Sequence, residues 1–178
     1  MGGYCYINNA AIAARYAESL GMGPVAVLDV DYHHGNGTQD IFYSDPSIFF
    51  ASVHANPQTD FQFYWGYSDE QGAGEGTGAN LNIPLPHGTT WPVYRAAAEQ
   101  ALAACTNWGA RLLVLSFGAD TFVDDPISNF ALETGDFARL GELIASAALP
   151  TVIVMEGGYA VGDLANNVEQ LLSGFGAG

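Results

Sequence analysis

Carboxylates and an imidazole follow the first of several short apolar runs. Asp29, Asp31 and His33 stand there at alternate positions, and alternate residues of an extended segment point to one side. Carboxylates brought together raise one another's pKa, a cost that a bound cation removes. With a carboxylate from Asp120, which follows another apolar run, the set offers the three ligands and open position of a catalytic zinc site. The sequence therefore predicts a metal centre, although an isolated D-x-H spacing is also typical of a hydrogen-bonded strand end.

Reactive side chains also follow the other apolar runs. The second run ends in Ser52-Val53-His54, and the last is followed by Glu156-Gly157-Gly158-Tyr159. Ligands of open parallel sheets bind at the carboxyl ends of the strands, so these segments are expected to converge. The alternation predicts that His34 points away from the metal. His54 is interpreted as a hydrogen-bonding residue of a strand end, and His87 as part of a turn.

Short runs rich in Val, Ile, Leu and Phe are expected to be buried strands, because they are too short for helices and end at polar or glycine-rich segments. Longer segments with helical periodicity lie between and around them. The expected strands are 25–30, 48–53, 112–117 and 151–155, and the expected helices are 10–20, 91–106, 137–148 and 163–172. This alternation predicts an α/β fold with a parallel sheet and helices on both faces, in a single domain over residues 1–178.

The chain is strongly acidic. Only 4 Lys and Arg residues oppose 19 Asp and Glu residues, for a formal net charge of -15. Such a surface repels phosphate backbones and anionic headgroups, which argues against nucleic acid or a membrane as partner, whereas a cationic ligand is attracted. Acidity that serves only solubility is the alternative. No apolar run could span a bilayer and the start lacks a signal-peptide pattern, so a cytoplasmic location is expected.

The segment from Ala55 to Gly78 fits neither a strand nor a helix. Its first part is aromatic and its second part is rich in glycine. Long loops in compact domains are usually functional, and this one is expected to be so; a mobile surface loop is the alternative. Its G-x-G spacing follows no strand and opens no helix, which argues against a dinucleotide site.

Four motifs occur in a characteristic order: residues 2–9 (GGYCYINN), 29–37 (DVDYHHGNG), 118–120 (GAD) and 156–159 (EGGY). In this order they resemble the arginase/deacetylase superfamily, on its histone deacetylase and acetylpolyamine amidohydrolase side. Segments 29–37 and 66–70 are most similar to bacterial acetylpolyamine amidohydrolases and class II-like deacetylases. The resemblance covers nearly the whole chain and implies an arginase/deacetylase-like fold.

The resemblance assigns roles to the residues of the predicted centre. It implies that Asp31, His33 and Asp120 bind one zinc ion per subunit and that Tyr159 polarises the carbonyl group of the substrate. Asp29 would orient a catalytic histidine. The implied reaction is metal-assisted hydrolysis of an acetylated amine, either acetyl-lysine or an acetylpolyamine, to acetate and the free amine.

A second cation is implied by the same resemblance. Potassium would be held by Asp29, by the backbone oxygens of Asp31 and His33, and by Ser52 and Val53. Asp29 would thus serve both the potassium ion and the catalytic histidine.

A narrow acyl channel is also implied. Gly3, Tyr4 and Gly158 would line it as substrate-binding residues. An aromatic residue of the 61–65 stretch, for which Phe63 is chosen, would face them. Asn36 stands where some members have an aspartate partner for a second catalytic histidine.

The sequence departs from the family pattern at its start. Members carry a Gly-His-His segment, which holds the catalytic histidine pair, and further strands upstream of the motif at residues 2–9. A truncated chain is therefore expected, with a partial fold, an open sheet edge, self-association into a homo-oligomer and little activity by itself. A natural short form that is inactive or is completed by a partner is the other reading of this departure. Two alternatives stay open: a non-catalytic zinc-binding scaffold, and an arginase-like di-metal hydrolase that uses Asp124 and Asp125.

Overall fold

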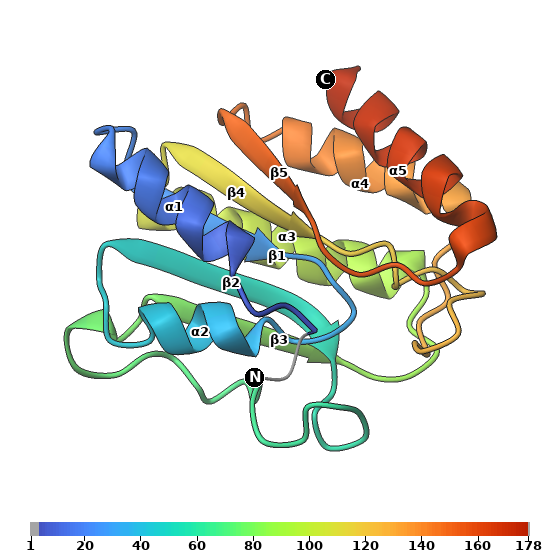
Figure 1. The fold of residues 1–178 in the computed structure, drawn as a ribbon, viewed down its shortest axis with the longest axis horizontal. Coiled ribbons are helices and arrows are strands. Elements are labelled where there is room, and N and C mark those ends of the chain that lie inside the picture. The colour runs from blue at the N-terminus through green and yellow to red at the C-terminus, as the bar shows by residue number, and fades with distance from the viewer. Residues whose placement is uncertain (1–3, 178) are drawn as a thin grey trace.

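The computed structural model describes residues 4–177, in which five strands form one parallel sheet in the order β3-β2-β1-β4-β5 (Figure 1). The strands are β1 (Val25–Asp29), β2 (Ile48–Ala55), β3 (Asn80–Leu85), β4 (Leu112–Phe117) and β5 (Thr151–Met155). The helices are α1 (Asn9–Ser19), α2 (Asn36–Phe42), α3 (Trp91–Trp108), α4 (Thr134–Ala145) and α5 (Val161–Gly176), with a short 3-10 turn η1 (Gly74–Gly76). The predicted fold class, a parallel sheet with helices on both faces, is confirmed.

Alternate residues of the central strand β1 serve two separate cores. Val25 and Val27 pack with α1 and with Phe42 of α2 on one face, whereas Ala26 and Leu28 pack with α3 and α4 on the other. All five residues of β1 are buried. Burial on both faces explains why the central strands have continuous apolar sequences, and it fixes the sheet that carries the polar strand ends.

Some boundaries differ from the sequence prediction. The helix expected over 137–148 begins at Thr134 and ends at Ala145. It starts a turn earlier because the side chains of Glu133 and Asp136 cap each other's backbone amides in a capping box. The long loop is confirmed, since residues 56–79 contain no regular element other than η1.

Two elements were not expected from the sequence. Strand β3 alternates Leu81, Ile83 and Leu85 with polar residues and proline, so a search for continuous apolar runs misses it. Its proline is tolerated because β3 is an edge strand. The seven-residue helix α2 follows the polar segment after β1 and is too short to show a helical period.

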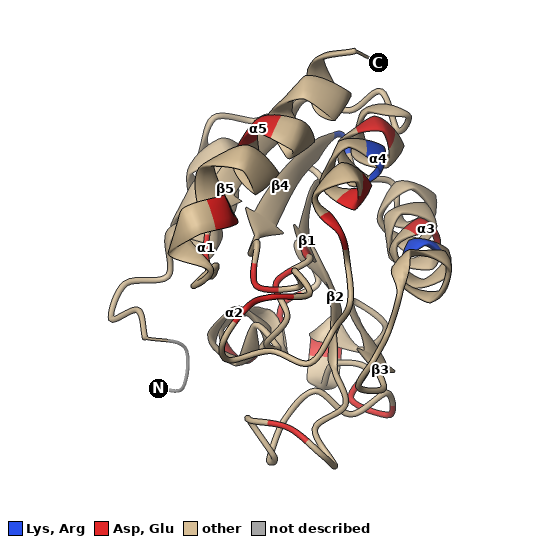
Figure 2. Ribbon diagram, turned by 90° about the vertical axis from the view of Figure 1, so that its right-hand side faces the viewer, with Lys and Arg blue, Asp and Glu red and all other residues tan. Residues whose placement is uncertain are grey.

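The surface of the molecule includes an exposed sheet edge and many acidic residues. Strand β5 forms one edge, and all its residues are at least partly exposed. Acidic residues spread over the helices and the strand-end loops, as Figure 2 shows. Within residues 4–177, no helix has both the length and the hydropathy needed to cross a bilayer.

Candidate metal centre

The carboxyl ends of β1, β4 and β5 meet at one end of the sheet. These strands are neighbours in the order β1-β4-β5. The segments beyond β4 and β5 are joined by a hydrogen bond of 2.8 Å from the amide of Ala119 to the carbonyl of Gly157. Asp31 and His33 follow β1, and Asp120 follows β4. The expected convergence of these strand ends is confirmed.

Asp31, His33 and Asp120 bring three potential ligand atoms within 4.8 Å of one another. His33 Nδ1 lies 3.0 Å from Asp120 Oδ2 and 3.4 Å from Asp31 Oδ1. Both carboxylates are buried and His33 is partly exposed. Among the residues that the structure describes, this is the one cluster of His, Cys, Asp or Glu that could hold a metal ion in this way.

Backbone amides fix the two carboxylates of this cluster. Asp120 Oδ1 accepts a hydrogen bond of 2.9 Å from the amide of Tyr32. Asp31 Oδ2 accepts one of 2.9 Å from the amide of Gly157, and Asp31 Oδ1 accepts one of 2.8 Å from the amide of His33. The oxygens are therefore positioned by the chain itself before any ion binds, which is the arrangement that a preorganised site requires.

Within residues 4–177, no lysine or arginine forms an ion pair with the carboxylates of the cluster. Burial disfavours protonation of His33, but hydrogen bonds to Asp120 and Asp31 outweigh it and raise the pKa of His33 to about 10. Burial and the negative charge of Asp31 raise the pKa of Asp120 to about 7. A protonated His33 would therefore offset part of the charge of the acids, and a divalent ion would displace its proton.

Two glycines show that the backbone is shaped around these carboxylates. A Cβ added at Gly118 would come within 2.1 Å of Asp31 Oδ2 and 2.7 Å of Asp120 Oδ1. A Cβ at Gly157 would come within 2.6 Å of Asp120 Oδ2 and 2.7 Å of Asp31 Oδ2. Two carboxylates and an imidazole in this cradle form a donor set that fits zinc.

Asp29 is the last residue of β1 and does not belong to the cluster of potential ligands. The extended segment assumed from the sequence ends at Asp29. Beyond it, the amide of Asp31 donates to Asp29 Oδ1 (3.0 Å) and the amide of His33 donates to Asp31 Oδ1, which are two successive Asx turns. The assumption of strand alternation past Asp29 is therefore wrong, although Asp31 and His33 still converge. Burial, followed by the charge of Asp31, raises the pKa of Asp29 well above its usual range.

The residues predicted to hold potassium are neighbours in the sheet. Ser52 is the register partner of Asp29, and Val53 follows it in β2. Both are fully buried. The hydroxyl of Ser52 lies 2.8 Å from Nδ1 of His54. The structure thus brings Asp29 and Ser52 together, and their role in cation binding stays a prediction.

Tyr159 lies between β5 and α5, on the side of the metal cluster. Its ring packs edge to face with the exposed ring of Tyr4, with centroids 6.1 Å apart. Burial and the charges of Asp120 and Asp31 raise the pKa of Tyr159 to about 12. The predicted channel residue Gly3 lies outside the described residues.

The other glycine of the predicted channel, Gly158, has a φ of +138°, which favours glycine. A Cβ there would meet Leu164 at 2.8 Å and Ala119 at 3.1 Å. The residue therefore allows the segment carrying Tyr159 to approach the segment after β4. Whether it contacts substrate stays a prediction.

Asp125 contacts the backbone next to Tyr159. Its Oδ2 accepts hydrogen bonds from the amides of Tyr159 (2.7 Å) and Ala160 (3.2 Å), at the start of α5. The arginase-like alternative needed Asp124 and Asp125 near the metal. The cluster of potential ligands in the described chain includes neither of them.

The aromatic segment 61–65 places Phe61 next to the cluster. The ring centroid of Phe61 lies 6.5 Å from that of His33. Phe63 is half exposed, and its carbonyl accepts a hydrogen bond from the hydroxyl of Tyr67. Phe61 is therefore a second candidate for the channel wall, and the choice of Phe63 stays a prediction.

The remaining histidines have other partners. His34 Nε2 lies 3.0 Å from Gln39 Oε1, so His34 points away from the metal cluster as predicted. His54 bonds to Ser52 and to the carbonyl of Gly66. His87 lies 2.8 Å from Asp60. In the described chain, no histidine besides His33 belongs to the metal cluster.

Sequence reasoning missed the residues that support this site from a distance. Gln39 and Glu70 form a buried network with His34 and the asparagines of β3, and Asp125 holds the backbone of Tyr159. The alternation of Asn80 and Asn82 with apolar residues was the available signal for β3. The partners of Gln39 and Asp125 are distant in sequence, and no local pattern reveals them.

Comparisons with known proteins identify the family of the chain. A sequence model of the histone deacetylase domain matches residues 1–175. Acetylpolyamine amidohydrolase 1 of Pseudomonas aeruginosa is 48% identical over 175 residues, which cover 98% of this chain and 51% of the relative. The chain spans about half the length of the curated relatives that it matches.

Solved structures show the same relation. The crystal structure of acetylpolyamine aminohydrolase from Burkholderia pseudomallei has a TM-score of 0.96 at 45% identity, covering 99% of this chain and 52% of that chain. A histone deacetylase homologue complexed with SAHA has a TM-score of 0.88 at 31% identity, covering 97% of this chain and 48% of that chain. With its fold, its strand-end motifs and its sequence all in agreement, the chain belongs to the histone deacetylase family.

Proposed function

We propose that this chain supplies the zinc centre and the carbonyl-polarising tyrosine of a deacetylase that acts on acetylated amines. The observation that carries the proposal is the cluster of Asp31, His33 and Asp120, with ligand atoms within 4.8 Å of one another. A zinc ion bound there supplies Lewis acidity toward the carbonyl oxygen and a water of lowered pKa. Elemental analysis of the purified chain, with one zinc per subunit expected, tests the assignment.

The side chains around this centre have distinct tasks. The hydroxyl of Tyr159, whose raised pKa of about 12 keeps it protonated well above neutral pH, donates a hydrogen bond to the oxygen on which negative charge develops. Asp29 orients the imidazole of a catalytic histidine. The aromatic segment 61–65, with Phe63 or Phe61, faces Gly3, Tyr4 and Gly158 across the acyl chain of the substrate.

In this proposal, none of the four histidines of the chain is the proton acceptor. Each of the four histidines of the chain has a partner already described, and only His33 faces the cluster. The chain by itself is therefore expected to turn over substrate about 10² to 10⁴ times more slowly than a form that includes a Gly-His-His segment. Equal rates with and without that segment, in an acetate-release assay, would contradict this assignment.

An acetylpolyamine is the substrate that the charge favours. The net charge of -15 attracts a cationic amine, and the relatives in Pseudomonas aeruginosa and Mycoplana ramosa are named acetylpolyamine amidohydrolases. Acetylputrescine should be preferred over a neutral acetyl-lysine derivative, and the preference should shrink as salt is added. A peptide with acetyl-lysine is the second candidate, because other relatives are named histone deacetylases.

A non-catalytic zinc-binding scaffold is the alternative for the chain on its own. Such a scaffold would bind zinc and hydroxamates but would release no acetate even after a segment with Gly-His-His is supplied. Restored turnover that Tyr159→Phe then abolishes would exclude it.

A structural potassium ion accompanies the zinc in this proposal. Asp29, Ser52, Val53 and the backbone oxygens of Asp31 and His33 would hold this ion. The ion would offset the charge that raises the pKa of Asp29. Potassium chloride should then raise the melting temperature more than tetramethylammonium chloride at equal ionic strength.

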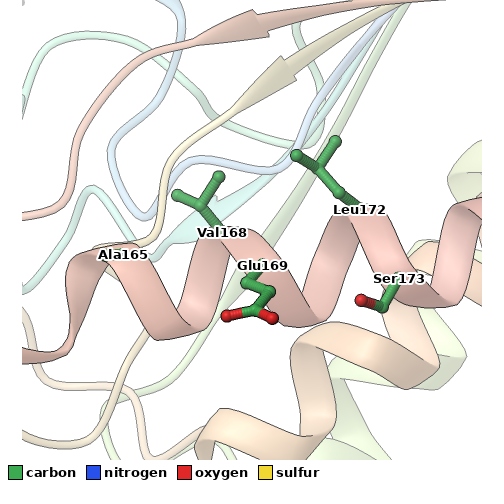
Figure 3. A pocket seen from close by; sticks show the side chains of 5 residues that line it. All are labelled: Ala165, Val168, Glu169, Leu172 and Ser173. Atoms are coloured by element: carbon green, nitrogen blue, oxygen red, sulfur yellow. The ribbon is translucent and has the colours of Figure 1, made fainter.

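Self-association covers the open side of the sheet in this proposal. Val152 and Met155 of the edge strand β5 are both 43% exposed. Helix α5 carries a pocket lined by Val168, Glu169 and Leu172 among others, and the side chains of Val168 and Leu172 project from the same side of the helix (Figure 3). Exposed strand edges and apolar patches favour association. Light scattering at micromolar concentration should detect a dimer or larger species.

A further inference from the structure

The aromatic segment 61–65 is fastened at its start to a residue that precedes His33. Asp60 accepts hydrogen bonds from the hydroxyl of Tyr32 and, at 2.9 Å, from the amide of Phe61. His87 Nε2 lies 2.8 Å from the same carboxylate. Tyr32 is fully buried, and its ring packs edge to face on His33 with centroids 4.9 Å apart. The start of the segment is therefore linked through Asp60 and Tyr32 to His33 of the metal cluster.

The end of the segment is fastened to the residue that follows His33. Gly66 has a φ of +97°, and a Cβ there would come within 2.9 Å of Cγ of His34. The amide of Gly66 donates to Glu70 Oε2 (2.9 Å), and its carbonyl lies 2.9 Å from Nε2 of His54. Gln39 Nε2 donates to the same oxygen of Glu70 (2.6 Å). Hydrogen bonds at both its amide and its carbonyl thus hold Gly66 close to the side chain of His34.

Between these two anchors the aromatic side chains are not held by burial. Phe61, Phe63 and Trp65 are exposed to 49%, 50% and 40%. Side chains that are about half exposed supply only part of the apolar burial that can fix the position of a loop. The ring of Phe61 nevertheless lies 6.5 Å from that of His33. Gln62 of the same segment is buried, so the anchors act together with this partial burial to set the position of the segment beside the metal cluster.

We propose that Glu70 and Asp60 are positioning residues that hold segment 61–65 as a wall beside the metal centre. In this role they determine how well the chain binds the extended part of a ligand, and not how tightly it binds the metal. The proposal rests on the function proposed above, since a wall matters only if an acyl group or its linker lies along it.

Glu70 offers a matched pair of substitutions. Its Oε2 alone accepts from Gly66, from Gln39 and, at 3.3 Å, from Asn82. Glu70→Gln keeps an oxygen at that place, whereas Glu70→Ala removes it. A role in positioning predicts that the glutamine variant behaves like the unchanged chain and that the alanine variant does not.

The test combines hydrogen exchange with two zinc-binding probes of different length. In the zinc-loaded chain, Glu70→Ala should raise amide exchange over residues 61–66 and weaken the long-chain hydroxamate SAHA by about tenfold or more, because small displacements of positioning groups have large effects. Zinc content and the affinity for acetohydroxamate, which reaches only the metal, should change by less than about twofold. Glu70→Gln should restore both the exchange and the affinity for SAHA.

Two results would overturn the proposal. In the first, Glu70→Ala leaves exchange over 61–66 and SAHA affinity unchanged. In the second, zinc, acetohydroxamate and SAHA binding all fall together in the alanine variant, which makes Glu70 a support of the metal centre. Failure of the unchanged chain to bind zinc would refute the proposed function instead, and the exchange measurement on the metal-free chain would still decide whether Glu70 anchors the segment.

Discussion

His33 and His34 are neighbours in the sequence, yet they lie in opposite electrostatic surroundings. Burial opposes protonation of both. At His33 the carboxylates of Asp120 and Asp31 outweigh burial and raise the pKa to about 10. At His34 burial dominates over the hydrogen bond to the neutral amide of Gln39, and the pKa falls to about 4. One peptide unit thus separates a histidine whose charged form two carboxylates favour from a histidine whose charged form burial disfavours.

The difference shows how a buried polar cluster indicates function. Among the described residues, no lysine or arginine pairs with the acids near His33, and binding a metal ion removes the cost of their negative charge. Around Gln39, the side-chain amides of Asn80 and Asn82 donate to Gln39 Oε1 at 3.1 and 2.8 Å, whereas Asn80 Oδ1, Asn82 Oδ1 and His34 Nδ1 have no hydrogen-bond partner among the described residues. We therefore expect changes in the first region to alter metal binding and changes in the second to alter stability.

The largest effect is expected from the ligand cluster. Asp120→Ala should remove measurable zinc binding, because a buried ligand and the partner of His33 Nδ1 are lost together. Elemental analysis and competition with a chelator measure the loss. Asp124→Ala, at an exposed carboxylate on the same segment, is the control and should bind zinc normally. Full metal content in the Asp120 variant would remove the distinction between the two regions.

The network around Gln39 should respond in the opposite way. Gln39→Ala deprives His34, Asn80 and Asn82 of an acceptor and should lower the free energy of unfolding by about 3 kcal/mol, given the cost of buried unpaired donors. Zinc affinity should change by less than about threefold. Urea unfolding and zinc titration measure the two quantities, with the exposed Gln58→Ala as control. A loss of zinc without a loss of stability would reverse the interpretation.

A smaller effect is expected at the glycine cradle. Gly118→Ala places a Cβ against both carboxylates and should weaken zinc binding while costing about 2 kcal/mol of stability, as overpacking typically does. Gly162 in α5 has no atom within 4 Å of an added Cβ. Gly162→Ala should leave zinc affinity and stability nearly unchanged. Equal behaviour of the two variants would show that the backbone at Gly118 yields without cost.

The two regions should also respond to pH with opposite signs. The pKa of His33 is raised above the unfolded value, so its contribution to stability is complete below about pH 6.5 and is lost as the pH rises toward about 10. The pKa values of His34 and His54 fall to about 4 and about 3 because of burial, so stability is lost as the pH falls below about 6.5.

The matching measurement is urea unfolding of the metal-free chain across pH. Between about pH 7 and pH 9 the free energy of unfolding should fall by on the order of 1 kcal/mol, and bound zinc should remove this fall because the ion replaces the proton on His33. His33→Gln should remove it as well. A fall of the same size in that variant would assign the effect to other groups.

Much of the fold could be predicted from the sequence because burial leaves a local pattern. The strands over 112–117 and 151–155 lie where the apolar runs predict them, and the parallel sheet follows from their alternation with helices. Strand β3 was not predicted because its sequence is not a continuous apolar run. Its buried asparagines are hydrogen-bonded to Gln39. The start of α4 was misplaced because its acidic cap is not the usual Ser or Thr.

For the site, the sequence by itself determined which residues could be ligands. Asp31, His33 and Asp120 have the required chemistry and follow strands whose carboxyl ends must meet in a parallel sheet. Only the tertiary structure decided their surroundings. Asp29 accepts a hydrogen bond from the amide of Asp31 and is not part of the cluster, and Asp125 accepts one from the amide of Tyr159. Gly66 lies against the side chain of His34. The physical reason is distance along the chain. Ligand type and strand periodicity are local properties, whereas pKa shifts and hydrogen-bond partners depend on side chains that folding brings together from elsewhere.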